Sequence, residues 1–125
     1  MTKEEKKKYL KKRKDVRCDC KKRRPNEDRS KYGTCRCDSY SMSHTFGIVI
    51  SNYLYQYLAD AKGVIIREDW EIIEKHADAI RDYAEDDNSD INSDELRERW
   101  KFLEKERKWR EAMFWLTENI QSLWW

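Results

Sequence analysis

Apolar residues recur at helical spacing between Phe46 and Ala61, and this stripe commits the centre of the chain to an α-helix. Seven positions fall at i, i+4, i+7, i+8, i+11, i+12 and i+15, which lie on one side of a helix. Ser41 or Ser43 can cap its start, and Gly63 can stop it. Three alternating tyrosines would also suit a strand, but the helical pattern is longer. The seven residues are Phe46, Ile50, Tyr53, Leu54, Tyr57, Leu58 and Ala61.

The composition agrees with a small helical domain. The 125 residues include only three Gly and one Pro, too few for a turn-rich β protein. Charged residues make up 42% of the chain and apolar residues 38%, so the core must be small. Aromatic rings bury a large area each, and six Trp, seven Tyr and three Phe can close such a core.

Two more helices are predicted after the first. The segment 68–85 has apolar residues from Trp70 to Ala84 at helical spacing, and acidic residues in its first turn. The segment 93–124 has a similar pattern, interrupted by the charged residues 104–108, where we expect the helix to kink or to stand partly in solvent. With a first helix at about 43–62, the prediction is an all-α domain of three helices within residues 41–125.

Charge is divided unequally along the chain. Residues 1–37 contain 16 Lys/Arg and 6 Asp/Glu, a net charge of +10, whereas residues 38–125 contain 11 and 19, a net charge of −8. Such a division predicts a basic arm that seeks polyanions, attached to an acidic body. Residues 1–17 have only Tyr9, Leu10 and Val16 as apolar surface, so we expect a flexible tail that a partner would order.

Four cysteines in two Cys-x-Cys pairs predict a metal-bound knuckle over residues 18–40. Four thiolates complete a tetrahedral zinc site, and a segment without a core of its own gains its stability from such a metal. His44 could replace one thiolate. Disulfides between the pairs and free thiols are the alternatives, which a reducing intracellular setting disfavours. The expected Zn²⁺ ligands are Cys18, Cys20, Cys35 and Cys37.

The basic arm also predicts contact with nucleic acid or another polyanion. Its Lys and Arg runs are dense enough to neutralise several phosphates, although charge runs position a protein without reading a sequence. The alternative is a solubilising or targeting tail. The residues expected to contact phosphates are Lys11, Lys12, Arg13, Lys14, Lys21, Lys22, Arg23 and Arg24.

The C-terminal helix carries five tryptophans, more than a small core needs. Trp115 lies off its main apolar stripe, and a Trp124–Trp125 pair is hard to bury completely. Exposed Trp is enriched in protein interfaces, so these three residues predict a surface for a protein partner or for self-association. The alternative is that all of them pack in the core.

Other classes of protein find little support in the sequence. We find no nucleophile motif or phosphate-binding Gly loop, and we expect no enzymatic activity. The longest apolar run is five residues (112–116), where a membrane span needs roughly 20, so we expect a cytoplasmic protein without membrane contact. The acidic residues 86–94 resemble a calcium loop but lack its Gly and its final Glu, and a polar linker explains them better.

The sequence therefore predicts a small non-enzymatic zinc-binding protein. Its basic arm would contact nucleic acid, and its acidic helical body would engage a protein. The alternative is an inhibitor or adaptor, of the kind that viruses and mobile elements encode, that binds a protein without nucleic acid.

Overall fold

The computed structural model describes residues 3–16, 31, 42–60, 67–85 and 96–123. These residues form four α-helices and a short 3₁₀ helix, with no strand among them. The prediction of an all-helical fold is confirmed for this part of the chain. The helices are α1 (Lys3–Lys12), α3 (Met42–Asp60), α4 (Arg67–Glu85), α5 (Leu96–Asn119) and the 3₁₀ helix η3 (Ile120–Ser122).

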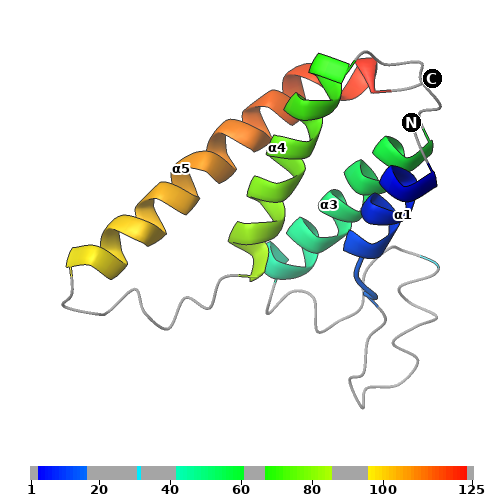
Figure 1. The fold of residues 1–125 in the computed structure, drawn as a ribbon. Helices are drawn as coiled ribbons and strands as arrows, with labels where there is room; N and C mark the ends of the chain where they lie inside the picture. Colours follow the sequence, from blue (N-terminus) through cyan, green and yellow to red (C-terminus); the bar gives the residue numbers. More distant parts are fainter. Residues whose placement is uncertain (1–2, 17–30, 32–41, 61–66, 86–95, 124–125) are drawn as a thin grey trace.

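The helices lie side by side with α4 in the centre. One side of α4 packs on α3 and the other on α5, and α1 packs on α3 (Figure 1). The predicted helices 43–62 and 68–85 correspond to α3 and α4, whose described ends mostly lie within one or two residues of prediction. The predicted helix 93–124 corresponds to α5 and η3.

The core forms where α3, α4 and α5 meet. Leu58 and Tyr55 of α3, Ile80 and Ala77 of α4, and Ala112 of α5 are almost completely buried. Burying one Leu or Ile side chain contributes about 1.5–3 kcal/mol, so a few such residues dominate the stability of this small body. The stripe that predicted the central helix therefore supplies part of its core.

Small residues let α3 and α4 approach closely at one end. A Cβ atom built on Gly47 would lie 2.6 Å from the Cβ of Ala84, so α3 needs a glycine there. One turn further, the hydroxyl of Ser51 donates to the carbonyls of Gly47 and Ile48 at 2.7 and 3.0 Å. His44 donates through Nδ1 to the carbonyl of Ala84 at 2.5 Å and so caps the end of α4.

Helix α5 runs without interruption through the charged residues 104–108. Tyr83 of α4 holds this part of α5 to the body, since its ring lies 6.2 Å from that of Phe102 and 4.7 Å from that of Trp109. Most side chains of residues 103–108 are exposed, in agreement with the expected partial exposure to solvent. At the other end, the amide of Asn119 donates to the carbonyl of Trp115 where α5 gives way to η3.

Residues 3–12, within the predicted flexible tail, form helix α1 in the structure, and this helix packs on α3. Tyr9 is only 6% exposed, and it joins the core cluster from α1. The sequence predicted a flexible tail because residues 1–17 contain few apolar side chains. The apolar count does not show that one aromatic ring is buried, which is worth about 2 kcal/mol, or that lysines of the same helix meet an acidic row on α4.

Candidate functional site

Helix α1 is held on α4 by side chains of matched spacing. Lys8 and Lys12 are four residues apart on α1, and Glu74 and Asp78 are four apart on α4. Lys8 lies 3.1 Å from Glu74, and Lys12 lies 3.4 Å from Glu74 and 3.1 Å from Asp78. The hydroxyl of Tyr9 donates to Glu74 at 2.8 Å between them. Lys8 and Lys12 of the basic arm are thus paired with carboxylates of α4.

Two outer ion pairs extend this contact. Lys6 lies 3.9 Å from Asp60 at the end of α3, and Lys14 lies 2.5 Å from Glu85 at the end of α4. Exposed pairs of this kind contribute only about 0.2–1 kcal/mol each. These two ion pairs therefore stabilise the docked position of α1 less than the burial of the Tyr9 ring does.

A buried guanidinium joins the arm to both central helices. Arg81 of α4 is 7% exposed and donates to Ser51 at 2.8 Å, to Asn52 at 2.6 Å and to the carbonyl of Lys12 at 2.5 Å. It also lies 5.2 Å from the ring centre of Tyr55, a distance at which a cation is attracted to an aromatic face. α1, α3 and α4 therefore meet at one hydrogen-bonded group.

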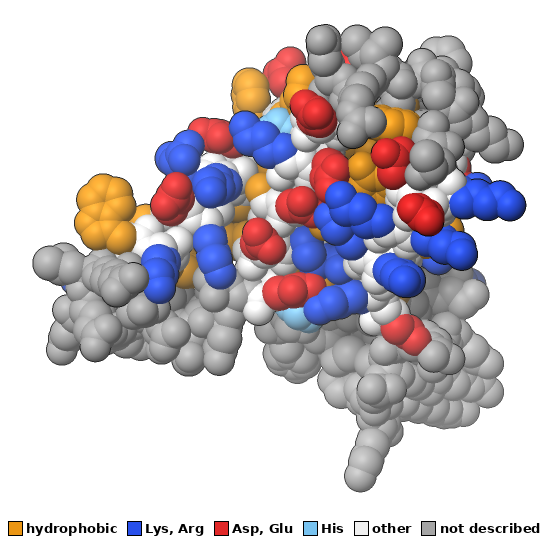
Figure 2. Space-filling model, in the orientation of Figure 1, with side chains coloured by type: hydrophobic (Ala, Val, Ile, Leu, Met, Phe, Trp, Pro, Cys, Tyr) orange, Lys and Arg blue, Asp and Glu red, His pale blue; other side chains and the backbone are white. Residues whose placement is uncertain are grey.

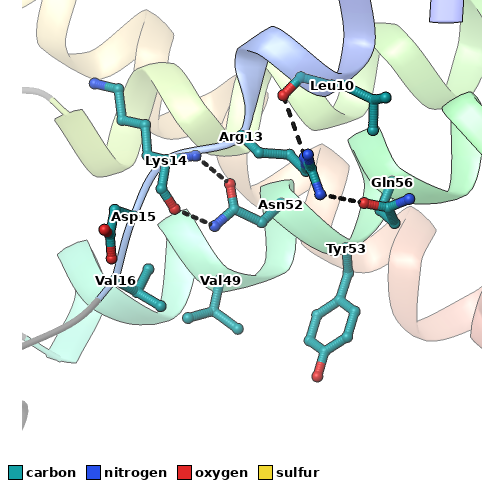
Figure 3. A pocket seen from close by; sticks show the side chains of 9 residues that line it. All are labelled: Leu10, Arg13, Lys14, Asp15, Val16, Val49, Asn52, Tyr53 and Gln56. Carbon is teal, nitrogen blue, oxygen red and sulfur yellow. Dashed lines mark hydrogen bonds between the residues drawn. The ribbon is translucent and has the colours of Figure 1, made fainter. Parts of the chain in front are cut away.

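The segment after α1 runs along α3, and the two together line an open, shallow pocket (Figure 3). The amide of Asn52 accepts a hydrogen bond from the backbone N–H of Lys14 and donates one to its carbonyl, both at 2.8 Å. Arg13 donates to the side chain of Gln56 at 2.5 Å and to the carbonyl of Leu10 at 3.2 Å. Both acceptors are neutral, so neither hydrogen bond offsets the positive charge of Arg13 beside this pocket, which Asp15 also lines.

The environment shifts the pKa values of four groups among the described residues. Burial, followed by the charge of Asp69, raises the pKa of Tyr57. Burial alone would raise the pKa of Glu74, but hydrogen bonds from Tyr9 and Lys8 and the charge of Lys12 lower it below its ordinary value. Burial, followed by a hydrogen bond to Asp78 at 2.6 Å, raises the pKa of Tyr55. Burial and the charge of Lys75 lower the pKa of His76, against an opposing effect of Glu111. At neutral pH, Glu74 therefore stays charged, and Tyr55 and His76 stay neutral.

The predicted phosphate-binding residues have different fates. Lys12, Arg13 and Lys14 bond to the body, whereas Lys11 is exposed. Figure 2 shows Lys and Arg side chains interspersed with Asp and Glu across this face, without a purely basic surface. The other four residues of this prediction lie outside the described residues: Lys21, Lys22, Arg23 and Arg24.

The predicted metal ligands cannot be compared with the structure. Cys18, Cys20, Cys35 and Cys37 all lie outside the described residues. Within the described ranges, no group of three or more His, Cys, Asp or Glu side chains is arranged to hold a metal ion. His44, the possible substitute ligand, has its Nδ1 bonded to the backbone of α4.

An apolar groove of about 600 Å³ lies between α3 and the end of α5. Tyr53 on its α3 side is 72% exposed, and Ile120 on its α5 side is 59% exposed. The described residues that line it include no charged side chain, although 42% of the chain is charged. We call this feature the α3–α5 groove; its lining residues are Phe46, Ile50, Tyr53, Leu54, Gln56, Tyr57, Leu116, Ile120 and Leu123.

Of the three tryptophans singled out by the sequence, only Trp115 lies among the described residues. Trp115 is partly buried, and its ring stacks on His76 with 4.7 Å between centroids. Trp124 and Trp125 lie outside the described residues. Trp100 and Phe114, which are 71% and 68% exposed, project from α5 instead. Their positions off the core stripe could have identified them from the sequence.

The chain matches no family model, no curated protein and no solved structure. No helix in the described part of the chain combines the length and apolar character that crossing a bilayer requires. The proposed function therefore rests on the contacts and the exposed surfaces of the residues themselves.

Proposed function

We propose that this chain is a non-enzymatic binding protein that engages a protein partner through the α3–α5 groove. The observation that carries the proposal is an apolar groove, without a charged side chain among its described lining residues, whose rim residues Tyr53 and Ile120 stand largely in solvent. Exposed apolar surface of this kind is costly to keep and is typical of interaction sites. This is the adaptor or inhibitor class that the sequence left as the alternative.

An amphipathic helix with one acidic side is the occupant that fits the groove best. A helix can lay apolar side chains at i, i+3 and i+7 into such a groove. Tyr53 and Gln56 belong both to the groove and to the neighbouring pocket at Arg13. A carboxylate at the edge of the bound helix would therefore meet the guanidinium of Arg13, whose described acceptors are neutral.

Selection from a displayed peptide library tests this proposal. The library would contain amphipathic helices about four turns long, half with Glu and half with Lys beside the apolar face. We expect the purified chain to enrich Glu-bearing peptides. Ile120→Lys should reduce the affinity of the selected peptides at least tenfold, because it places a charge in the groove. Arg13→Gln should reduce the preference for Glu over Lys.

Ile72→Lys on α4 is the matched control, because Ile72 is also an exposed isoleucine but lies outside the groove. Peptide binding should be unchanged in this variant. The proposal is wrong if no peptide is enriched, or if Ile120→Lys and Ile72→Lys bind the selected peptides equally well.

Nucleic-acid binding is the second candidate, and one row of lysines favours it. Lys3, Lys7 and Lys11 recur every four residues on α1 and are exposed. None of the ion pairs found among the described residues uses them. A single strand bound to three lysines shows a salt dependence of affinity with a slope near −2 on logarithmic axes, at about −0.7 per phosphate.

Replacing these three lysines by Gln should reduce the slope for a labelled single-stranded RNA or DNA by about 2. Three lysines of α5 provide the control, and their replacement should leave the slope unchanged. An unchanged slope in the α1 variant would remove this row as a nucleic-acid site. The control residues are Lys101, Lys105 and Lys108.

Zinc binding by the four cysteines remains a proposal that rests on their number and spacing in the sequence. In this proposal the metal is structural: it orders the segment between α1 and α3 and takes no part in a reaction. Partner binding through the α3–α5 groove requires no contact with the metal.

A further inference from the structure

The outer face of α5 carries large apolar side chains in solvent. Trp100, Leu103 and Phe114 are 71%, 56% and 68% exposed. They fall on the same side of the helix as Arg107 and Arg110, because these five residues follow one another at spacings of three and four. The opposite side of α5, with Ala112 and Leu116, packs on the body. We call the exposed side the outer face of α5.

The two aromatic residues of the outer face lie equally far along the helix from Arg107. An aromatic residue lies seven positions away on each side, Trp100 and Phe114, and a glutamate lies three or four positions away, Glu104 and Glu111. Arg107 lies 2.6 Å from Glu111 and 4.0 Å from Glu104 in the same helix. When two copies run antiparallel about Arg107, positions equally far from it on opposite sides face each other, so Trp100 meets Phe114, Glu104 meets Arg110 and Leu103 meets Glu111.

We propose that two copies of this chain associate antiparallel through their α5 outer faces, with Arg107 at the two-fold axis. This register places Trp100 of one copy against Phe114 of the second, twice. It also places Glu104 of one copy against Arg110 of the second. Each Arg107 then lies near the glutamates of the other helix, which offset the repulsion between the two central arginines.

The charges near the axis favour a second copy over a generic apolar partner. Exposed aromatic residues alone would fit many surfaces. Here charged side chains lie between the aromatic residues, and the antiparallel register brings opposite charges together at Glu104 and Arg110. Arg110 is free to turn toward this contact, because its pair with Glu106, at 2.9 Å, lies in solvent and contributes little. The outer face is separate from the α3–α5 groove, so this proposal does not depend on the proposed function.

Sedimentation equilibrium over a concentration range of roughly 10⁻⁶ to 10⁻⁴ M tests the association. The average mass of the purified full chain should rise from 15.4 kDa toward twice that value. Arg110→Glu alone and Glu104→Arg alone should each remain monomeric, because each sets like charges opposite one another. An equal mixture of these two variants should form a dimer again, since both contacts between the two copies then join opposite charges, one in the original sense and one reversed.

Glu71→Arg on α4 is the matched charge reversal outside the outer face, and it should dimerise like the original chain. Circular dichroism of each variant checks that the helices are intact. A mass of 15.4 kDa for the original chain at every concentration would overturn the proposal. So would dimerisation of both single variants, or a mixture that stays monomeric.

Discussion

Replacing Arg81 by Met removes the hydrogen-bonded group at which three helices meet. Ser51 keeps its own bonds to the carbonyls of α3, and Asn52 keeps two bonds to the backbone of Lys14. The carbonyl of Lys12 loses the donor that Arg81 provides. Three bonds to a charged donor are lost and one acceptor is left unpaired, which should lower the free energy of unfolding by about 2–4 kcal/mol.

Urea unfolding followed by circular dichroism measures this change. Arg13→Met is the matched control, because Arg13 joins the same arm to α3 but is exposed. Its two bonds to neutral acceptors lie in solvent, and their loss should cost less than about 1 kcal/mol. If Arg81→Met and Arg13→Met destabilise the chain equally, the assigned role of the buried guanidinium is wrong.

Three further predictions concern separate features. Gly47→Ala should lower the free energy of unfolding in urea by about 1–3 kcal/mol, because the new methyl group meets the side chain of Ala84. This would occur although alanine is favoured over glycine in helices by about 1 kcal/mol. Adding Ala84→Gly to the same chain should relieve the clash. Glu74 has a lowered pKa, so its stabilising effect is complete above its ordinary pKa of 4.5 and is lost as the pH falls through the lower pKa of the folded state. Glu74→Gln should therefore flatten the dependence of the free energy of unfolding on pH in this acidic range, as measured by urea unfolding. Elemental analysis of the chain purified in reducing buffer should find one zinc per chain, and far less than one equivalent would remove the metal proposal.

The helices of the body could be predicted because their apolar residues repeat at helical spacing. That pattern located both ends of α4 and the start of α3 to within one residue. The docking of α1 could not be predicted from the same pattern. It depends on one buried ring and on the meeting of Lys8 and Lys12 with Glu74 and Asp78, and these residues are more than sixty positions apart in the sequence.

The candidate site was predicted only in part, for a related reason. Phe46, Ile50 and Tyr53 were expected on the apolar side of a helix, but a stripe does not show which of its members another helix will cover. The tertiary arrangement leaves Tyr53 in solvent and buries Leu54 beside it. Charge density likewise suggested Lys12 as a phosphate contact, because a count of cations does not reveal the carboxylates they meet in the fold.

Hydrogen exchange at the backbone amides of residues 7–12 tests most directly whether the arm is held on the body. These amides are the ones in α1 that can bond to a carbonyl one turn earlier. An arm docked through Tyr9, Glu74 and Arg81 should protect them nearly as well as the amides of α4. Exchange at the rate of an unstructured peptide would show that the arm is free, and would return the basic residues to the nucleic-acid role that their charge first suggested.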